Sequence, residues 1–329
     1  MTTRARESNV RELSVRELSV RVPASTSNLG SGFDAVGMAI DRWLTVGARI
    51  HSNDSPVTVT REGTIARLTC APAEDLIWRG FVAACTALGR TPPDGVEIFA
   101  TSDIPVARGL GSSAAAVVAG VLLANAVLGG DMDRAAIVDV AASLEGHPDN
   151  VAPSVLGGAV LSVRTSAQHY RSAPITVHPS LRFVFVVPDF EVRTSVARAV
   201  LPATVPHDVA VNAAARGAAL IVGLQTADAA ILVPALDDLL HVPFRRALIR
   251  GYDAVTAAAV GAGAIGATLS GSGSAIVAVV RRDAAAKVCD AVVSAWRSAG
   301  VNAEAFVTAA EPRGATIGDA RLYKERLRT

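Results

Sequence analysis

Lysine is almost absent from this chain of 329 residues, which contains only Lys287 and Lys324, neither of them near glycine. A Walker A phosphate loop is therefore excluded, because its glycines are followed by lysine and then by serine or threonine. Cysteine is also scarce: Cys70, Cys85 and Cys289 are scattered and lack the spacing of metal ligands. We expect three buried thiols in a reducing compartment.

A large charge imbalance and a long apolar run are missing too. The formal net charge is +1, so nothing favours nucleic acid or an anionic membrane as a partner. The longest apolar run, residues 114–128, is interrupted by Asn125 and is too short to span a membrane. The first residues are rich in arginine and glutamate and hold no apolar segment of a secretory signal. We therefore expect a cytoplasmic protein with no nucleic-acid and no membrane partner.

The composition that remains is that of a globular protein, with half of the residues apolar and 19% charged. The length predicts one large or two medium-sized domains. Near the start, Val-Arg-Glu-Leu-Ser occurs twice in tandem, from Val10 and from Val15. Only one copy is needed to begin a strand, so we interpret residues 1–19 as a loosely attached extension.

Residues 105–116 carry the strongest functional signal, with the sequence Pro-Val-Ala-Arg-Gly-Leu-Gly-Ser-Ser-Ala-Ala-Ala. A strand-like segment precedes them, and residues 114–128 predict a buried helix because they are rich in alanine, valine and leucine and lack proline. The loop thus delivers two glycines and two serines to a helix N-terminus.

This arrangement suits an anion. Gly109 and Gly111 let the backbone approach a ligand closely, and the first N–H groups of a helix are unpaired and carry the positive end of its dipole. Together they predict a phosphate-binding site, in which Ser112 or Ser113 can place a hydroxyl on a metal ion. The alternative is a serine-capped helix after a glycine turn.

Two more segments of the first half hold candidate ligands. A strand from Val20 enters a loop with Asn28 and Asp34, whose side chains form either a ligand surface or caps on their own backbone. Further on, a short helix delivers Glu145, either a metal ligand or a solvated helix-end carboxylate. His147 has no second histidine at the spacing of a zinc site.

In the second half, a buried strand at 181–188 precedes a helix on which Thr194 and Arg198 share a face, because they are four residues apart. A later turn carries Arg245 and Arg246. Arginines are usually solvated, so a function for Arg198 or Arg245 needs outside support.

A Gly-x-Gly-x-x-Gly pattern occurs at residues 261–266. A dinucleotide-binding fingerprint follows a strand and opens a helix, whereas here a helix precedes the pattern and a strand follows it. We therefore reject that interpretation. Residues 267–275 are better interpreted as a small-residue loop that approaches the glycine loop from the other domain.

Three small-residue loops resemble, in order and separation, the motifs of the GHMP small-molecule kinases: residues 28–37, 109–113 and 270–274. Three further segments resemble the homoserine kinases within that superfamily: Asn-Leu-Gly-Ser-Gly-Phe-Asp (28–34), Glu-Gly-His-Pro-Asp-Asn-Val-Ala-Pro (145–153) and Pro-Asp-Phe-Glu-Val-Arg-Thr-Ser-Val-Ala-Arg (188–198). The resemblance covers nearly the whole chain, from about Val20 to about Ile317.

The resemblance implies an α+β, two-domain GHMP kinase fold. Its N-terminal domain has a βαβ unit of left-handed connection, against the usual rule, and its C-terminal domain is ferredoxin-like, with the active site between them. The expected divisions are an extension at 1–19, an ATP-binding domain at 20–172 and a C-terminal domain at 173–329. The family also suggests a homodimer.

The resemblance also implies roles for individual residues. Ser113 and Glu145 would bind Mg²⁺. Asn28 and Asp34 would take the ammonium end of L-homoserine, Arg198 and Arg245 its α-carboxylate, and Asn150 and Thr194 would lie near the reacting hydroxyl. The ATP phosphates would be held by the glycine loop: Pro105, Val106, Ala107, Arg108, Gly109, Leu110, Gly111, Ser112, Ser113, Ala114 and Ala115.

The implied reaction is ATP-dependent phosphorylation of homoserine to O-phospho-L-homoserine, in threonine biosynthesis. Asn150 stands seven residues before Gly157, where mevalonate kinases carry an Asp proposed as the base, so we expect catalysis without a protein base. The alternatives are a GHMP kinase for mevalonate-like acids or sugars, and a non-catalytic sensor. Ser113 and Glu145 argue against a sensor, which has no need for catalytic Mg²⁺.

Overall fold

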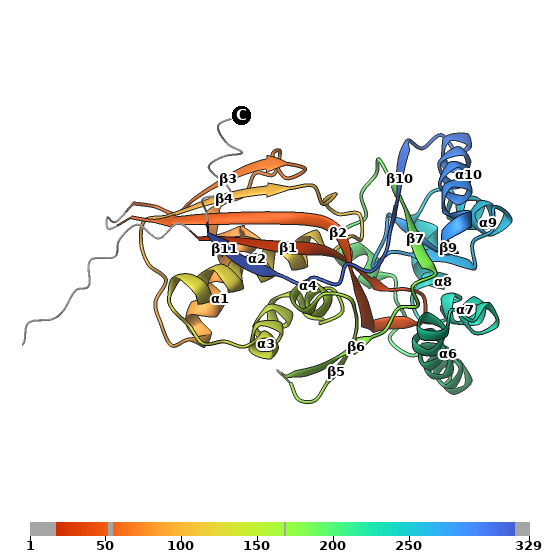
Figure 1. The fold of residues 1–329 in the computed structure, drawn as a ribbon, viewed down its shortest axis with the longest axis horizontal. Helices are drawn as coiled ribbons and strands as arrows, with labels where there is room; N and C mark the ends of the chain where they lie inside the picture. Colours follow the sequence, from red (N-terminus) through yellow and green to blue (C-terminus); the bar gives the residue numbers. More distant parts are fainter. Residues whose placement is uncertain (1–17, 52–54, 168, 320–329) are drawn as a thin grey trace, which may run out of the picture.

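A computed structural model describes residues 18–51, 55–167 and 169–319 (Figure 1). All but the last two residues of the predicted extension lie outside the described residues. The chain forms two sheets, each with its own helices, which confirms the expected α+β class.

The larger sheet has seven strands in the order β11-β1-β2-β4-β3, with β5 paired to β2 and β6 to β5. β3 and β4 are parallel, and α1 connects them in a βαβ unit. The strands are β1 (Leu18–Asn28), β2 (Gly32–Ile50), β3 (Thr58–Gly63), β4 (Val96–Ser102), β5 (Ala159–Arg164), β6 (Tyr170–Ile175) and β11 (Thr316–Asp319).

Helices cover one face of this sheet (Figure 1): α1 (Leu76–Ala87), α2 (Ser112–Val127), α3 (Arg134–Glu145) and α4 (Val151–Leu156), with a 3-10 turn, η1 (Pro72–Glu74), before α1. α2 is the central one, with apolar residues buried all around its axis. Such a helix belongs in a core, and its N-terminus is therefore fixed in place.

The smaller sheet is antiparallel throughout, in the order β10-β7-β9-β8. Counted along the chain, this is the order 4-1-3-2 of a ferredoxin-like domain, as expected. Its strands are β7 (Leu181–Pro188), β8 (Gly266–Leu269), β9 (Ile276–Arg281) and β10 (Ala303–Thr308). Its helical segments are α5 (Thr194–Ala199), α6 (His207–Thr226), α7 (Ala229–Leu236), α8 (Val242–Arg245), η2 (Arg246–Leu248), α9 (Tyr252–Gly261), η3 (Arg282–Ala284) and α10 (Ala285–Ser298).

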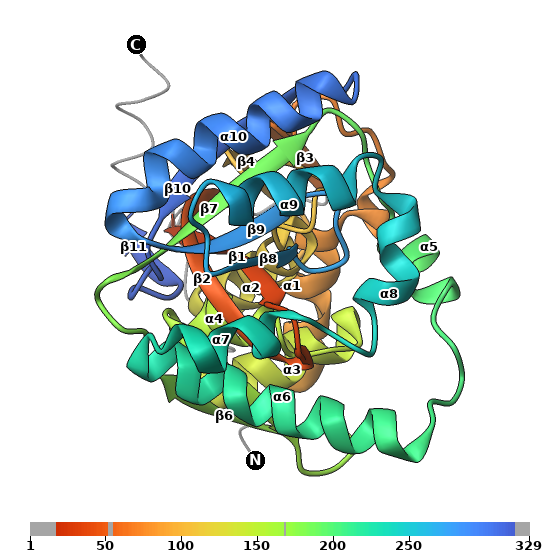
Figure 2. The ribbon, with the colours of Figure 1, turned by 90° about the vertical axis from the view of Figure 1, so that its right-hand side faces the viewer.

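Alternate residues of β7 face two different cores, as the two-residue period of a strand requires. Val184 and Val186 pack into a cluster with α9 and α10, which lie across the outer side of the sheet (Figure 2). Phe183 and Phe185 join the core of the first domain. The sheet is therefore buried on both faces, and the two domains share an apolar contact.

The C-terminal segment is divided between the two sheets. Residues 303–308 form β10 of the smaller sheet, and β11 then crosses to the first sheet, where Ile317 pairs with Val20. β6 also spans the predicted boundary at 172. We propose that the first domain extends through β6 and includes β11.

Of two further expectations from the sequence, the structure confirms one and corrects the other. The rejection of a dinucleotide motif is confirmed, because α9 ends at Gly261 and β8 begins at Gly266. The expectation of three buried thiols is correct for Cys85 only, since Cys289 is partly exposed and Cys70 is exposed. Cys70 follows the first domain's β3 in a loop that is open to solvent.

Among the described residues, one helix, α6, is long and apolar enough to cross a membrane by length and composition alone, with a mean hydropathy of 1.2 over its most apolar segment. Leu220 and Leu224 of α6 pack into the large core, and its Gly223 contacts Leu232 of α7. The buried side of α6 thus packs on protein.

Gly120 of α2 provides a test of the α1–α2 packing. A Cβ at this position would lie 1.9 Å from the carbonyl oxygen of Ile77, and backbone cannot yield cheaply. We expect Gly120→Ala to lower the free energy of unfolding by about 1–3 kcal/mol, measured by urea denaturation. Gly261→Ala is the matched control, because nothing lies within 4 Å of that Cβ; an equal loss in both variants would contradict the packing argument.

Candidate active site

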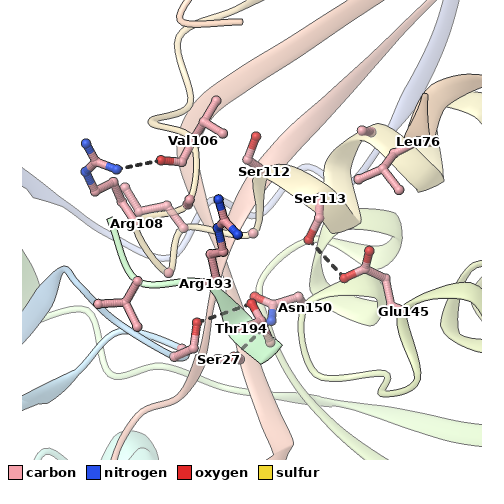
Figure 3. A pocket seen from close by; sticks show the side chains of 18 of the residues that line it. Ser27, Leu76, Val106, Arg108, Ser112, Ser113, Glu145, Asn150, Arg193 and Thr194 are labelled. Carbon is pink, nitrogen blue, oxygen red and sulfur yellow. Dashed lines mark hydrogen bonds between the residues drawn. The ribbon is translucent and has the colours of Figure 1, made fainter. Parts of the chain in front are cut away.

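A cavity of about 460 Å³ lies between the two domains, and nearly all the predicted site residues line it (Figure 3). The glycine loop from Val106 to Ser113 forms one wall. Pro105, Ala114 and Ala115, which we expected to hold phosphates, do not line the cavity; Ala114 and Ala115 are buried in α2 and support the loop from behind.

The glycine loop is held by close backbone contacts. Gly109 and Gly111 have φ values of +73° and +67°, the left-handed region that favours glycine. A Cβ on Gly109 would lie 2.0 Å from the carbonyl oxygen of Ser270, and one on Gly111 would lie 2.1 Å from Oγ of Ser25. Both positions therefore require glycine for packing as well as for conformation.

The third loop contacts the glycine loop from the other domain, as expected. Ser270 Oγ donates to the carbonyl of Gly109 at 2.6 Å, and the amide of Ala275 donates to the carbonyl of Arg108 at 3.0 Å. The N-terminus of α2 has no side-chain cap. The alternative of a serine-capped helix is therefore wrong, and the first-turn amides of α2 remain available to an anion.

Ser113 and Glu145 lie together on the α2 side of the cavity (Figure 3), where Ser113 Oγ donates to Glu145 Oε2 at 3.0 Å. Burial raises the pKa of Glu145, while the charge of His147 and the bond from Ser113 oppose that rise. No group of three or more His, Cys, Asp or Glu side chains within the described ranges is arranged to hold a metal ion. A hydroxyl and one carboxylate fit Mg²⁺ that is carried by phosphates, because Mg²⁺ keeps water and phosphate oxygens as its other ligands.

Asn150 has its amide fixed at both ends by β1. Its Oδ1 accepts from Ser25 Oγ at 3.1 Å, and its Nδ2 donates to Ser27 Oγ at 3.0 Å. The neighbouring Asp149 also lines the cavity but is almost completely buried, with Oδ1 2.5 Å from Nδ1 of His147. Burial lowers the pKa of His147, but the bond to Asp149 and its charge outweigh burial, so the pKa is raised overall. The Asp149 carboxylate is therefore already engaged by the imidazole of His147.

Asp34 and Arg198 meet across the domain boundary. Two bonds, of 3.0 and 3.2 Å, join the guanidinium to the carboxylate, and each side chain is a little over a third exposed. Asn28 also lines the cavity, and both ends of its amide bond backbone: its Oδ1 accepts from the amide of Asp34, and its Nδ2 donates to the carbonyl of Gly271. Both residues therefore belong to the cavity wall, and a role of Asn28 at the ammonium group stays a prediction.

The structure separates Arg245 from Arg246. Arg245 is 2% exposed and lines the cavity, whereas Arg246 is exposed and lies 3.6 Å from Asp253 at the surface. Nε of Arg245 donates to the carbonyl of Ala197 at 3.0 Å. Within the described ranges no carboxylate forms an ion pair with Arg245, and burial lowers its pKa. An anion in the cavity would supply the missing partner.

His241 supports Arg245 and was missed by the sequence analysis. Its ring is fully buried, stacks on Phe33 at 4.9 Å and lies with Nδ1 3.3 Å from Nη1 of Arg245. Burial lowers the pKa of His241, so its neutral form can accept that bond while Nε2 donates to the carbonyl of Gly30. The four-residue spacing of His241 and Arg245 was the available signal.

The family model "GHMP kinases N terminal domain" matches residues 75–158, and "GHMP kinases C terminal" matches residues 211–298. The homoserine kinase of Trichormus variabilis is 38% identical over 297 residues, which are 90% of this chain and 97% of that protein. The homoserine kinase of Gloeobacter violaceus is 41% identical over 290 residues, 85% of this chain and 93% of that one.

Among solved structures, the homoserine kinase of Cytophaga hutchinsonii aligns with a TM-score of 0.82 and 29% identity, over 94% of this chain and 99% of that chain. A mevalonate kinase aligns with a TM-score of 0.64 and 12% identity, over 90% of this chain and 99% of that chain. The second likeness concerns the fold alone.

We expect Gly109→Ala to lower the affinity for nucleotide more than it lowers the free energy of unfolding. A left-handed alanine costs about 1–2 kcal/mol, and the clash with Ser270 additionally displaces the loop. We expect affinity for ATP, measured by calorimetry, to fall at least tenfold. Gly129→Ala is the matched control: its φ is +61° and nothing lies within 4 Å of its Cβ, so it should lose stability and keep its affinity. Unchanged affinity in Gly109→Ala would contradict a role for this loop.

Proposed function

This chain belongs to the GHMP kinase family, and from that premise we propose that it phosphorylates the side-chain hydroxyl of L-homoserine with ATP, giving O-phospho-L-homoserine for threonine biosynthesis. Relatives named homoserine kinase over nearly the whole chain support this. The observation that carries it is the placement of a carboxylate, Asp34, opposite two guanidiniums, Arg198 and Arg245, in the cavity that the glycine loop lines.

A zwitterionic amino acid fits between these charges. Asp34 would bind the ammonium group, while Arg198 and Arg245 would bind the α-carboxylate. In the structure, Asp34 and Arg198 pair with each other. An ion pair this exposed contributes about 1 kcal/mol or less, so it opens easily. When the zwitterion enters, every charge of the pair gains a new partner and none is left uncompensated.

On the nucleotide side, the amides of the glycine loop and of the first turn of α2 would bind the phosphates of ATP. Ser113 and Glu145 would hold Mg²⁺, which neutralises phosphate charge when bound. Thr194, whose Oγ1 lies 3.4 Å from Oγ of Ser272, lies at the cavity wall where it would orient the acceptor hydroxyl together with Asn150.

We propose that no protein base removes the hydroxyl proton. Asn150 cannot accept a proton, and Asp149 is held by His147. The barrier would be lowered by in-line alignment of the acceptor and by fixed positive charge around the γ-phosphoryl group. The proton would pass to a phosphate oxygen late in the reaction.

The second candidate is a GHMP kinase for mevalonate-like acids or sugars. For such an acceptor the Asp34–Arg198 pair would stay closed, and a carboxylate would have Arg245 alone. A sensor without activity has no use for Ser113 and Glu145. A cytoplasmic location, a homodimer and the lack of nucleic-acid and membrane partners stay predictions.

A coupled ADP-release assay with homoserine, threonine, mevalonate and galactose as acceptors tests the proposal. We expect homoserine to be preferred over each of the others by at least a hundredfold in kcat/KM. Turnover with mevalonate or galactose alone would favour the second candidate. ATP binding without turnover of any acceptor would favour a sensor.

Asp34→Asn tests the zwitterion site. Loss of a charged partner for the ammonium group costs about 1.5–3 kcal/mol, so we expect the KM for homoserine to rise about 10- to 150-fold, with the KM for ATP changed less than threefold. Asp253→Asn removes a carboxylate from a surface ion pair and should change neither. Equal effects on both substrates would contradict the assignment of Asp34.

Asn150 and Asp149 test the mechanism without a base. Removing a general base typically lowers kcat by 10²–10⁴. We expect Asn150→Ala and Asp149→Asn each to lower kcat by less than about a hundredfold, and Asn150→Asp to bring no gain. The proposal is wrong if Asn150→Ala abolishes turnover while Asn150→Asp raises it strongly. It is also wrong if Asp149→Asn alone lowers kcat by about 10²–10⁴, as the loss of a general base does, and flattens the pH dependence of kcat.

A further inference from the structure

Five arginines line the cavity, and four of them have partners in the protein. Arg61 binds Asp75, Arg108 lies 3.2 Å from Glu191, and Arg198 and Arg245 are engaged as described above. Within the part of the chain that the structure describes, the side chain of Arg193 makes no hydrogen bond, ion pair or ring contact. All N–H groups of this guanidinium are therefore available to a ligand in the active-site cavity.

Arg193 comes from a segment that is fastened to the glycine loop. The amide of Val192, the preceding residue, donates to the carbonyl of Ala107 at 3.3 Å. Nε of Arg108 donates to the carbonyl of Pro188 at 2.9 Å, and Ser274 Oγ donates to the carbonyl of Phe190 at 2.6 Å. The backbone of Arg193 is thus held beside the phosphate loop, although its side chain is exposed.

Figure 3 shows the Arg193 guanidinium pointing into the cavity, on the side of Ser112 and Ser113. No lysine lines this cavity, whereas phosphoryl transfer needs positive charge at the transferring group. An acidic residue, Glu145, lines the same cavity beside Ser113. A free guanidinium, which can bind two phosphate oxygens at once, has the shape and the charge to supply the positive charge.

We propose that Arg193 is a further catalytic residue, which binds the terminal phosphate of the nucleotide from the C-terminal domain and stabilises the charge of the transferring phosphoryl group. In the transfer, the bond between the γ-phosphorus and the β–γ bridging oxygen breaks, a bond to the acceptor oxygen forms, and ADP leaves with the electron pair. The hydroxyl proton goes to a phosphate oxygen. Arg193 donates hydrogen bonds throughout and gives up no proton. The inference rests on the proposed function only in requiring a nucleoside triphosphate in this cavity.

Binding can be measured without any acceptor. Calorimetry of Arg193→Gln with ADP and with the non-hydrolysable analogue AMP-PNP, both with Mg²⁺, should show a loss of at least about tenfold for AMP-PNP and less than threefold for ADP. Arg193→Lys should lie between Arg193→Gln and the unchanged protein, because it keeps the charge and loses the planar fork. Arg297→Gln, which removes an exposed arginine at the end of α10, should change neither affinity.

Kinetics supply the second readout. We expect Arg193→Gln to lower kcat by at least about a hundredfold, within reach of the 10³–10⁵ supplied by arginine fingers, with the KM for homoserine nearly unchanged. Equal losses for ADP and AMP-PNP, an unchanged kcat, or an effect confined to the KM for homoserine would each overturn the proposal. If homoserine is not a substrate at all but AMP-PNP selectivity still depends on Arg193, then the proposed function fails and this inference stands.

Discussion

The architecture of the site depends on hydrogen bonds that tie one short loop to the opposite domain. Carbonyls of the glycine loop accept from Ser270, Ala275 and Val192, all of which belong to the C-terminal half of the chain. With its carbonyls turned outward and bonded, the loop is left with its amides for a ligand. A mobile loop would lose part of its binding energy to ordering, whereas this one is already shaped by the contact between domains.

The same contact between domains explains how the cavity handles charge. Asp34 comes from the first domain and Arg198 from the second, and they neutralise each other across the boundary. Behind them lies Arg245, a buried guanidinium carried by a neutral histidine and an aromatic ring. The ion pair between Asp34 and Arg198 can exchange partners, while Arg245 is held in place. Together they favour an acceptor that carries both a positive and a negative charge.

Sequence alone predicted the elements that depend on local pattern. The helix after the glycine loop and the buried strand at 181–188 are where periodicity and composition placed them, whereas residues 267–269 of the predicted small-residue loop belong to β8 and only residues 270–275 form the loop. The family resemblance predicted the folds of both domains, and the glycine loop and several of the charged side chains that line the cavity. What could not be predicted needs the folded geometry. The two serines of β1 that anchor the Asn150 amide lie 125 and 123 residues away in the chain. His241 and Arg245, and likewise His147 and Asp149, are close in sequence, but each contact depends on how the two side chains are oriented.

Arg193 is a further residue whose proposed role could not be predicted from the sequence. It stands inside a motif that resembles the homoserine kinases, but that resemblance implies a role for Arg198, five positions later, and none for Arg193. Arg193 is singled out by its surroundings in the structure, where the Arg198 guanidinium is bonded to the Asp34 carboxylate and the Arg193 guanidinium is not bonded to any carboxylate of the described residues. What an arginine can bind depends on which N–H groups of its guanidinium are not already bonded to neighbouring residues.

The pairing of β11 with β1 has a consequence for how the chain assembles during synthesis. Leu18 lies opposite Asp319, so the first and the last of the described residues form one ladder. β1 leaves the ribosome early but has an open edge until almost the entire chain has followed. Pairings of such sequence separation close slowly, and an unpaired strand edge invites association with other chains. The first sheet is therefore completed only after the strands of the second, because the edge of β1 that faces away from β2 is paired by β11 alone.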